Sequence, residues 1–207
     1  MKNKVITSLI LFIGLSIHAQ IYTFDYKINF NSYNEKTKVS TNESSYLINS
    51  KNPLYEMHIF EKNGRLCDYE NKTLRYISYN KVNNIYQFYS YQRKLMLGND
   101  KLIDHIVVNE IAKNHYSIKC FPKKANKNAK LEIIVKLKAA DEDLIRFYYL
   151  DVSYDMKNEL IGRLKEKLNG NYNYIIESFS VNYRKNDTKS NSYITSAEKV
   201  NLKIMPQ

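Results

Sequence analysis

Apolar and polar residues alternate along most of the chain, beginning with the stretch "IYTFDYKINF" at residues 21–30. Because successive side chains of a strand point to opposite faces, this alternation predicts a β-strand with one apolar and one polar face. These apolar side chains could form a closed core, or they could line a groove that holds an apolar ligand. The apolar register consists of Tyr22, Phe24, Tyr26, Ile28 and Phe30.

Similar strand patterns follow in long succession, separated by turn residues. The polar stretch at 31–38 predicts the first turn, and Pro53, Gly64 and Asn71 predict later ones. Alternation of this kind is typical of antiparallel sheet with one dry face and one wet face. The further strands are expected at 44–50, 53–62, 64–71, 72–81, 84–92, 102–111, 115–121, 129–138, 171–185 and 196–206.

One segment has helical instead of strand periodicity, at about residues 155–169. Asp155 is placed to cap its start, and Gly170 is placed to end it in the left-handed conformation. A helix with one apolar stripe must bury that stripe, and the large partner available is the inner face of the sheet. We therefore predict a mainly β fold of the α+β type, with a strongly curved antiparallel sheet or half barrel and one late helix packed on its inner face. The predicted stripe consists of Met156, Leu160, Ile161, Leu164 and Leu168.

The first 19 residues have the pattern of a secretory signal peptide. Lys2 and Lys4 precede an apolar segment of roughly 13 residues, whereas a membrane-spanning helix needs about 20. Cleavage is expected between Ala19 and Gln20, and Gln20 stands where a lipoprotein would need a cysteine. We expect residues 20–207 to form a single β-rich domain in the periplasm or outside the cell, with no transmembrane segment.

The formal net charge of +11 suggests an acidic partner. Nucleic acid is not expected, because the chain is exported and most basic residues alternate with acidic ones. The stretch "KCFPKKANKNAK" is the exception, since Lys123, Lys124 and Lys127 lie there without any acidic residue. These lysines could bind an anionic envelope surface, although a solvated loop between two strands is the favoured interpretation.

Two cysteines, Cys67 and Cys120, lie in predicted strands. Export permits a disulfide between them, which would require their strands to be neighbours. The alternative is two small buried hydrophobic side chains.

Recognisable catalytic and cofactor motifs are absent from the sequence. Its histidines form no HxH or HxxxH arrangement, and zinc-ligand spacings, a GxSxG elbow, a phosphate-binding loop and a dinucleotide fingerprint are missing. We therefore predict no catalytic residue, no metal ligand and no cofactor. A hydrolase built from scattered residues is left without support.

Tyrosine is abundant, with 19 residues in the chain. Its ring tolerates a half-exposed groove because its hydroxyl group can remain in water. Several tyrosines could line a ligand mouth or carry a partner surface, although tyrosine is also an ordinary strand residue on a solvent face. The candidates are Tyr86, Tyr89, Tyr91, Tyr148 and Tyr149.

The order of these predicted elements resembles that of the lipoprotein-carrier family and related small secreted envelope proteins. The shared features are an aromatic first strand, a meander of strands, a late inserted helix and a strand at the end. The resemblance implies a half-barrel sheet around helices, with apolar space between them that holds acyl chains. The present chain departs from that family because it has one predicted helix instead of several, and no functional residue is carried over.

Three functions from different classes follow from these observations. The first is the binding of a lipid or another apolar or amphiphilic ligand between sheet and helix, with Leu160 and Leu164 facing the first strand. It predicts a cavity of roughly several hundred Å³ that is open at one edge. The second is a cell-envelope interaction or scaffold module with a filled core, and the third, less favoured, is a hydrolase with convergent polar groups in a cleft.

Overall fold

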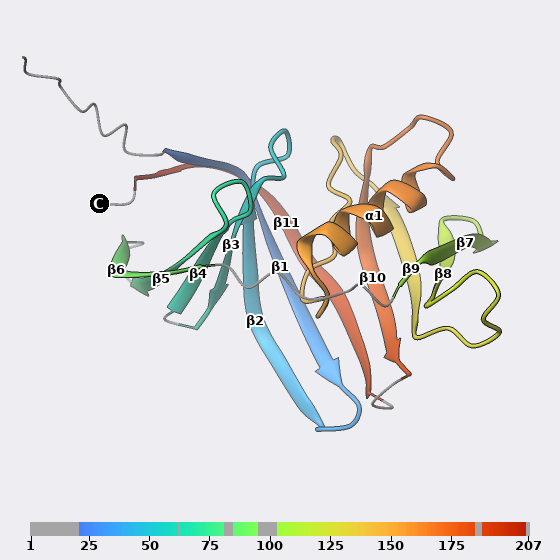
Figure 1. The fold of residues 1–207 in the computed structure, drawn as a ribbon. Coiled ribbons are helices and arrows are strands. Elements are labelled where there is room, and N and C mark those ends of the chain that lie inside the picture. The colour runs from blue at the N-terminus through green and yellow to red at the C-terminus, as the bar shows by residue number, and fades with distance from the viewer. Residues whose placement is uncertain (1–20, 62, 81–84, 95–102, 185–187, 206–207) are drawn as a thin grey trace, which may run out of the picture.

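Eleven strands form one antiparallel sheet in a computed structural model of the protein, which describes residues 21–61, 63–80, 85–94, 103–184 and 188–205 (Figure 1). The strand order is β6-β5-β4-β3-β2-β1-β11-β10-β9-β8-β7, so β6 and β7 are the edges of an open sheet. The predicted signal peptide at 1–19 and the cleavage site after Ala19 lie outside the described residues. The strands are β1 (Tyr22–Asn34), β2 (Val39–Ile48), β3 (Tyr55–Phe60), β4 (Asn63–Asp68), β5 (Thr73–Asn80), β6 (Ile85–Lys94), β7 (His105–Ala112), β8 (His115–Phe121), β9 (Leu131–Ala139), β10 (Tyr174–Tyr183) and β11 (Thr188–Ile204).

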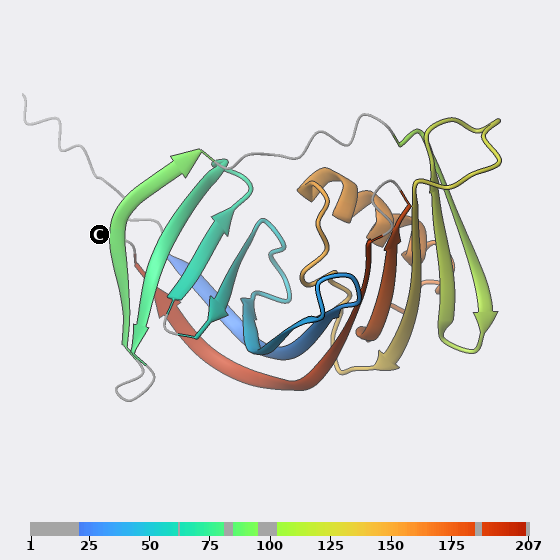
Figure 2. The ribbon, with the colours of Figure 1, turned by 90° about the horizontal axis from the view of Figure 1, so that it is seen from below.

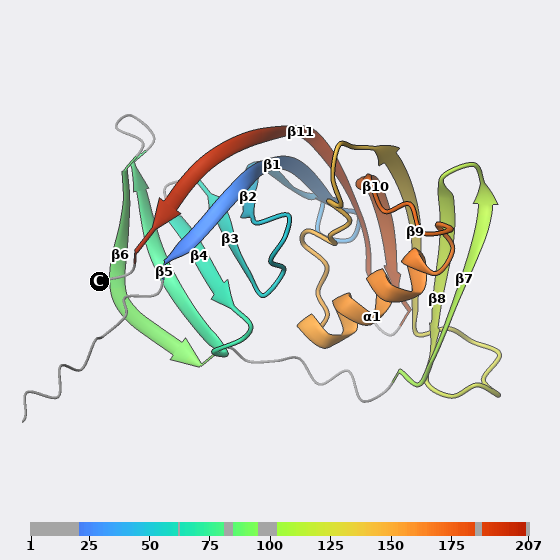
Figure 3. The same cartoon turned by 90° about the horizontal axis from the view of Figure 1, so that it is seen from above.

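The sheet is strongly curved, and a helix lies on its inner side. Figures 2 and 3 show the strands following an arch, with helix α1 (Tyr154–Lys165) inside the arch beside β8, β9 and β10. This arrangement confirms the predicted fold class, a curved antiparallel sheet with one late helix. Within the described ranges, no helix is long and apolar enough to cross a membrane.

The first and last strands pair at the centre of the sheet. Tyr22 lies opposite Ile204, and the antiparallel register continues to Asn34 opposite Ser190. The predicted turn at 31–38 was too long, because residues 31–34 continue β1, and β11 begins at Thr188 instead of residue 196. Polar side chains are tolerated here because β1 pairs on both sides, and the buried hydroxyls of Ser32 and Ser192 bond to each other.

Helix α1 begins slightly earlier than predicted. Ser153, and not Asp155, is the N-cap, and its Oγ accepts a hydrogen bond from the backbone N–H of Met156 at 3.2 Å. Asp155 instead lies in the first turn, where a negative charge favours the helix dipole. The α-helix ends at Lys165, and Gly170 has the expected left-handed conformation, with φ of 81°, after a further turn.

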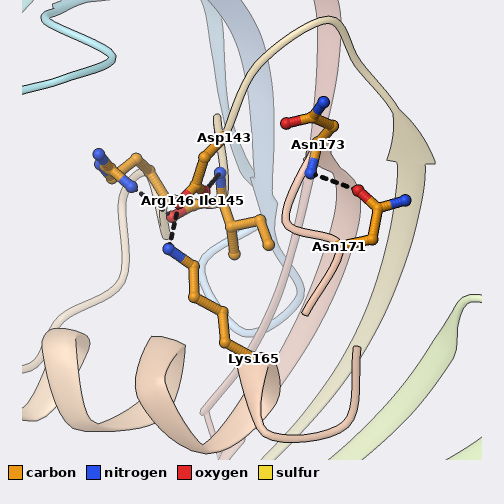
Figure 4. A network of polar contacts seen from close by, with 6 residues as sticks. All are labelled: Asp143, Ile145, Arg146, Lys165, Asn171 and Asn173. Atoms are coloured by element: carbon orange, nitrogen blue, oxygen red, sulfur yellow. Dashed lines mark hydrogen bonds and ion pairs between the residues drawn. The ribbon is translucent and has the colours of Figure 1, made fainter. Parts of the chain in front are cut away.

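The segment between β9 and α1 is tied to the helix by polar contacts. The carboxylate of Asp143 forms an ion pair with the ammonium group of Lys165, as Figure 4 shows. The same carboxylate accepts a hydrogen bond from the backbone N–H of Ile145 at 3.3 Å. Arg146 donates to the carbonyl of Ile145 at 2.9 Å. These contacts hold the segment against the end of the helix.

The buried apolar residues form three clusters. The helix core joins α1 to strands β7, β8, β9 and β10, and it includes Ile118, Ile133, Val135, Phe179, Leu160 and Leu164. The strand core includes Tyr22, Phe24, Leu47, Met57, Leu66 and Ile77. The central core includes Tyr26, Ile28, Phe30, Tyr46, Leu144 and Tyr148.

Candidate ligand-binding site

A cavity of about 500 Å³ lies between the strands β2–β4 and the segment that leads into α1. It is partly open to solvent, and its lining combines aromatic rings with charged and polar groups. The residues come from four stretches of the chain that are distant in sequence. The lining is formed by Asn34, Tyr46, Glu56, His58, Arg65, Cys67, Tyr69, Tyr149, Leu150, Asp151, Lys157, Tyr183, Thr188 and Ser190.

The strands β3 and β4 present different chemistry on their two faces. Glu56 and His58 of β3 line the cavity, whereas Met57 between them belongs to the strand core. On β4, Arg65 lines the cavity and Leu66 belongs to the strand core. Because side chains alternate along a strand, one face is polar and the other is apolar. The apolar face anchors the strands and leaves the polar face available for a ligand.

An aromatic stack forms the base of the cavity. The rings of Tyr46 and His58 lie 4.5 Å apart with an angle of 10° between their planes. Each residue is 6% exposed, and the ring of Tyr148 lies 5.0 Å from that of Tyr46. Burial of the hydroxyl raises the pKa of Tyr46 well above its ordinary value. The stacked rings of Tyr46 and His58 therefore present a flat aromatic surface, and the Tyr46 hydroxyl stays protonated near neutral pH.

His58 is held in its neutral form. Burial lowers its pKa from 6.5 to about 4, and the positive charges of Arg65 and Lys157 contribute further to the lowering. A nitrogen of the Arg65 side chain lies 3.4 Å from His58 Nδ1. In the described part of the chain, the buried Nε2 atom of His58 has no hydrogen-bond partner.

Glu56, Cys67 and Tyr69 form a second group in the cavity. The Tyr69 hydroxyl donates a hydrogen bond of 2.5 Å to the Glu56 carboxylate. Burial and the nearby charge of Glu56 raise the pKa of Tyr69, and the same two causes raise the pKa of Cys67 to about 12. The Cys67 thiol is therefore protonated near neutral pH, and a protonated thiol is a poor nucleophile.

A pair of stacked tyrosines closes one end of the cavity region. The ring of Tyr69 lies 3.8 Å from that of Tyr154, the first residue of α1, with an angle of 10° between the planes. The Tyr154 hydroxyl also donates to the carbonyl of Pro53 at 3.3 Å. These contacts connect the start of the helix to the connection between β2 and β3 and to the residue that follows β4.

Tyr149 lies at the open side of the cavity in a left-handed backbone conformation. Its φ is 61°, which is uncommon for a bulky residue, and its side chain is 45% exposed. Such conformations persist where the surrounding structure imposes them, and they are often found at functional sites. The buried neighbours Tyr148 and Leu150 provide that constraint here.

These groups support binding better than catalysis. The cavity holds a neutral imidazole and a protonated thiol, which are poor candidates for a general acid and a nucleophile near neutral pH. Within the described residues, no three His, Cys, Asp or Glu side chains are grouped so that they could hold a metal ion.

The aromatic row of the first strand is buried and does not line the cavity. Tyr22 and Phe24 lie in the strand core, and Tyr26, Ile28 and Phe30 lie in the central core. The helix does not cover this row. Leu160 and Leu164 are completely buried in the helix core, against strands β8–β10, and the central core is instead covered by Leu144 and Tyr148.

The two cysteines do not pair. Cys67 lies in β4 and Cys120 in β8, and both are free. Their strands lie in different halves of the sheet, and the alternative of two small buried side chains holds for Cys120, whereas Cys67 is partly exposed and lines the cavity. Cys120 is completely buried in the helix core.

The other predicted surface features lie in several places. Lys123, Lys124 and Lys127 lie in the connection between β8 and β9, outside the cavity, and their binding to an anionic surface stays a prediction. Of the candidate tyrosines, Tyr149 lines the cavity and Tyr148 is buried behind Tyr46. The side chains of Tyr86, Tyr89 and Tyr91 lie outside the described residues.

Sequence reasoning missed most charged and titratable residues of the cavity, among them Glu56, His58, Arg65 and Lys157. A usable signal was present in "YEMHIF", where Glu56 and His58 alternate with apolar residues on a strand that is bounded by other strands on both sides. The neighbouring strand places Arg65 opposite His58. Lys157 had no such signal, because it reaches the cavity from α1.

Comparisons with known proteins give little further information. No protein-family model matches the chain, and no curated protein matches it in sequence. The fold is similar to the crystal structure of a candidate outer membrane lipoprotein-sorting protein domain from Vibrio parahaemolyticus, with a TM-score of 0.35 and 8% sequence identity over 85% of each chain. This is the kind of protein that the predicted order of elements resembles, and at this TM-score the likeness assigns no function.

Proposed function

We propose that this protein is an exported, non-catalytic binding protein that holds a small amphiphilic ligand in the cavity between β2–β4 and the start of α1. The proposal rests on one observation, a partly open cavity of about 500 Å³ in the described structure. Ligand pockets typically measure about 300–1,000 Å³. A scaffold module with a filled core would not leave such a space.

The mixed lining indicates an amphiphile instead of a purely apolar ligand. Tyr46, Tyr149, Leu150 and Tyr183 offer flat or apolar surface to one part of a ligand. Charged groups on β3, β4 and α1 offer hydrogen bonds to another part. Export of the protein is supported by the pattern of residues 1–19, and a ligand from the cell envelope fits that location.

Native mass spectrometry of the mature protein, purified from its own envelope fraction, tests this proposal. We expect a reproducible bound mass at a ratio near one to one, which organic extraction removes. A cavity-filling variant, Ser190→Trp, should lose the bound mass because Ser190 is buried and lines the cavity.

Lys189→Trp is the matched control, since Lys189 is the neighbouring residue of β11, is exposed and does not line the cavity. It should keep the bound mass. Far-UV circular dichroism checks that both variants fold. Should Ser190→Trp fail to fold, Tyr149→Ala at the open side tests the same point by weakened retention. A wild-type protein that is free of ligand in repeated preparations would overturn the proposal.

A further inference from the structure

The cavity contains unpaired hydrogen-bond donors on one side, and these indicate the chemistry of the ligand. We propose that the ligand is an anionic amphiphile whose phosphate or carboxylate head group binds between Arg65, Lys157 and His58. This inference rests on the proposed binding function and adds the charge and the position of the head group. Three observations support it. They are the placement of Arg65 and Lys157, the absence of a carboxylate partner for either residue within the described structure, and the position of the proton on the His58 ring.

The first observation is that two positive charges converge on one imidazole. Arg65 comes from β4 and Lys157 from α1, and both line the cavity. Arg65 lies 3.4 Å from the His58 ring, and the charges of both Arg65 and Lys157 lower the pKa of His58. Like charges that converge in a partly buried site repel each other, so an anion between them would relieve the repulsion.

The second observation is that these two cations form no ion pair with any carboxylate of the described residues. Other basic side chains of the described structure do have such partners. Lys165 pairs with Asp143, Lys136 pairs with Glu177 at 2.7 Å, and Arg184 pairs with Glu132 at 2.7 Å. Arg65 instead contacts neutral rings, His58 at 3.4 Å and the face of Phe60 at 5.3 Å from the ring centroid. Arg65 and Lys157 are therefore not paired directly with a carboxylate, although the formal charges of the lining, which also holds Glu56 and Asp151, sum to zero.

The third observation concerns the proton on His58. A guanidinium group has donors and no acceptor, so His58 Nδ1 must accept in its contact with Arg65. The neutral ring then carries its proton on Nε2, which is a donor. This atom is buried and unpartnered in the described part of the chain, and an unpaired buried donor is unfavourable. An oxygen atom of a ligand would satisfy it once the side chains that cover this atom moved aside.

Within the described residues, the two carboxylates that line the cavity, Glu56 and Asp151, form no ion pair with Arg65 or Lys157. Glu56 accepts a short hydrogen bond from the Tyr69 hydroxyl, and Asp151 is exposed. The unused hydrogen-bonding groups on the His58 side are thus donors, and an anionic oxygen is the acceptor that binds them most strongly. Tyr149, Leu150 and Tyr183 remain available for the apolar part of the ligand.

Isothermal titration of the mature protein with three octyl compounds tests the inference, after a hydrophobic resin has removed any co-purified ligand. Octyl phosphate, octyl glucoside and octyltrimethylammonium have the same tail and differ in head-group charge. Each is used below its critical micelle concentration. We expect octyl phosphate to bind at least about tenfold more tightly than the other two, because a hydrogen bond to a charged group contributes about 1.5–3 kcal/mol.

Charge-neutralising variants locate the head group. Arg65→Gln and Lys157→Gln should each weaken octyl phosphate binding about tenfold and leave octyl glucoside binding unchanged. Arg163→Gln is the matched control on α1, since Arg163 is exposed and does not line the cavity. If Arg65→Gln fails to fold, binding by Lys157→Gln alone tests the position of the head group. This variant is expected to fold because Lys157 belongs to none of the three cores.

Each other outcome contradicts a defined part of the inference. Equal binding of all three octyl compounds would overturn the anionic head group and leave the proposed function intact. Inorganic phosphate that binds as tightly as octyl phosphate would support the anion site and overturn the amphiphile. Absence of binding by every octyl compound would contradict the proposed function itself.

Discussion

The two halves of the sheet bury their side chains in different ways. Strands β8–β10 turn an apolar face to α1, where Leu160 and Leu164 are completely buried. Strands β2–β4 turn an apolar face to the strand core and a polar face, with Glu56, His58 and Arg65, to the cavity. The half that the helix covers is filled, and the half that it does not cover keeps space for a ligand.

The dimensions of the elements explain this difference. A helix of 12 residues is about 18 Å long, whereas 11 strands spaced about 4.8 Å apart extend over roughly 50 Å. One helix therefore cannot cover the whole inner face of the sheet. The segment before the helix covers part of the remainder through Leu144 and Tyr148, and the cavity lies beyond it.

The largest expected effect is the loss of a buried side chain from the helix core. Leu164→Ala should lower the free energy of unfolding by about 2–5 kcal/mol, because it removes apolar contacts and leaves a cavity. Urea unfolding measures this value. Glu159→Ala on the exposed face of α1 is the control, with an expected change within about 0.5 kcal/mol. Equal effects of the two variants would mean that the helix does not fill its half of the sheet.

The second prediction concerns pH and the cavity half. The pKa of His58 is about 4 in the folded protein and has its ordinary value of 6.5 in the unfolded chain, so between these values the unfolded chain binds a proton that the folded protein does not bind. Stability is therefore fully present above pH 6.5 and is lost as the pH falls toward 4. The loss attributable to His58 is about 3 kcal/mol, since one pKa unit corresponds to about 1.4 kcal/mol.

The variant His58→Phe isolates this contribution, because a phenyl ring can stack on Tyr46 and cannot be protonated. Urea unfolding at pH 7 and pH 4 should show that the wild-type protein loses about 3 kcal/mol more than the variant. Parallel losses in the two proteins would contradict a buried neutral imidazole in the cavity.

A smaller effect is expected at the contact that joins the two halves. A double-mutant cycle with Tyr69→Ala and Tyr154→Ala should give a coupling energy of about 0.5–1.5 kcal/mol from the stacked rings. The control is a second cycle with Tyr69→Ala and Tyr172→Ala, since Tyr172 is exposed and follows the helix. Strict additivity of Tyr69→Ala and Tyr154→Ala would show that the halves are joined in another way.

The smallest effect on stability is expected in the connection between β8 and β9. Replacement of Lys123, Lys124 and Lys127 by Glu should change the free energy of unfolding by less than about 0.5 kcal/mol, because these side chains lie at the surface and outside the three cores. Binding to anionic lipid vesicles measures their predicted contact with an envelope surface. Unchanged vesicle binding by the triple variant would reject that contact.

Local patterns in the sequence predicted the elements better than their ends. The alternation in residues 21–30 correctly predicts β1, and the stripe from Met156 to Leu168 correctly predicts a helix. The cap was misplaced by two residues because Ser153 and Asp155 are both good N-caps. The extension of β1 through 31–34 could not be predicted, because it depends on pairing with β2 and β11.

The candidate site was much less predictable than the fold. Tyr149 was one of five tyrosines for which a ligand mouth was considered and an ordinary solvent face was favoured, and it lines the cavity. The aromatic row that posed the question of core or groove is buried within two cores and lies outside the cavity. His58 appeared isolated in the sequence because its cationic neighbours come from another strand and from the helix.

The sequence by itself determined the strand-rich architecture, the single amphipathic helix and the pattern of an export signal, because each depends on the spacing of residues that are close along the chain. Only the tertiary structure decided which face the helix covers and where space remains. The cavity joins residues from Asn34 to Ser190, and their meeting depends on strand order, sheet curvature and helix length. The row at residues 21–30 contributes to the core, and the proposed binding site forms between β2–β4, the segment before α1 and Lys157 at the start of the helix.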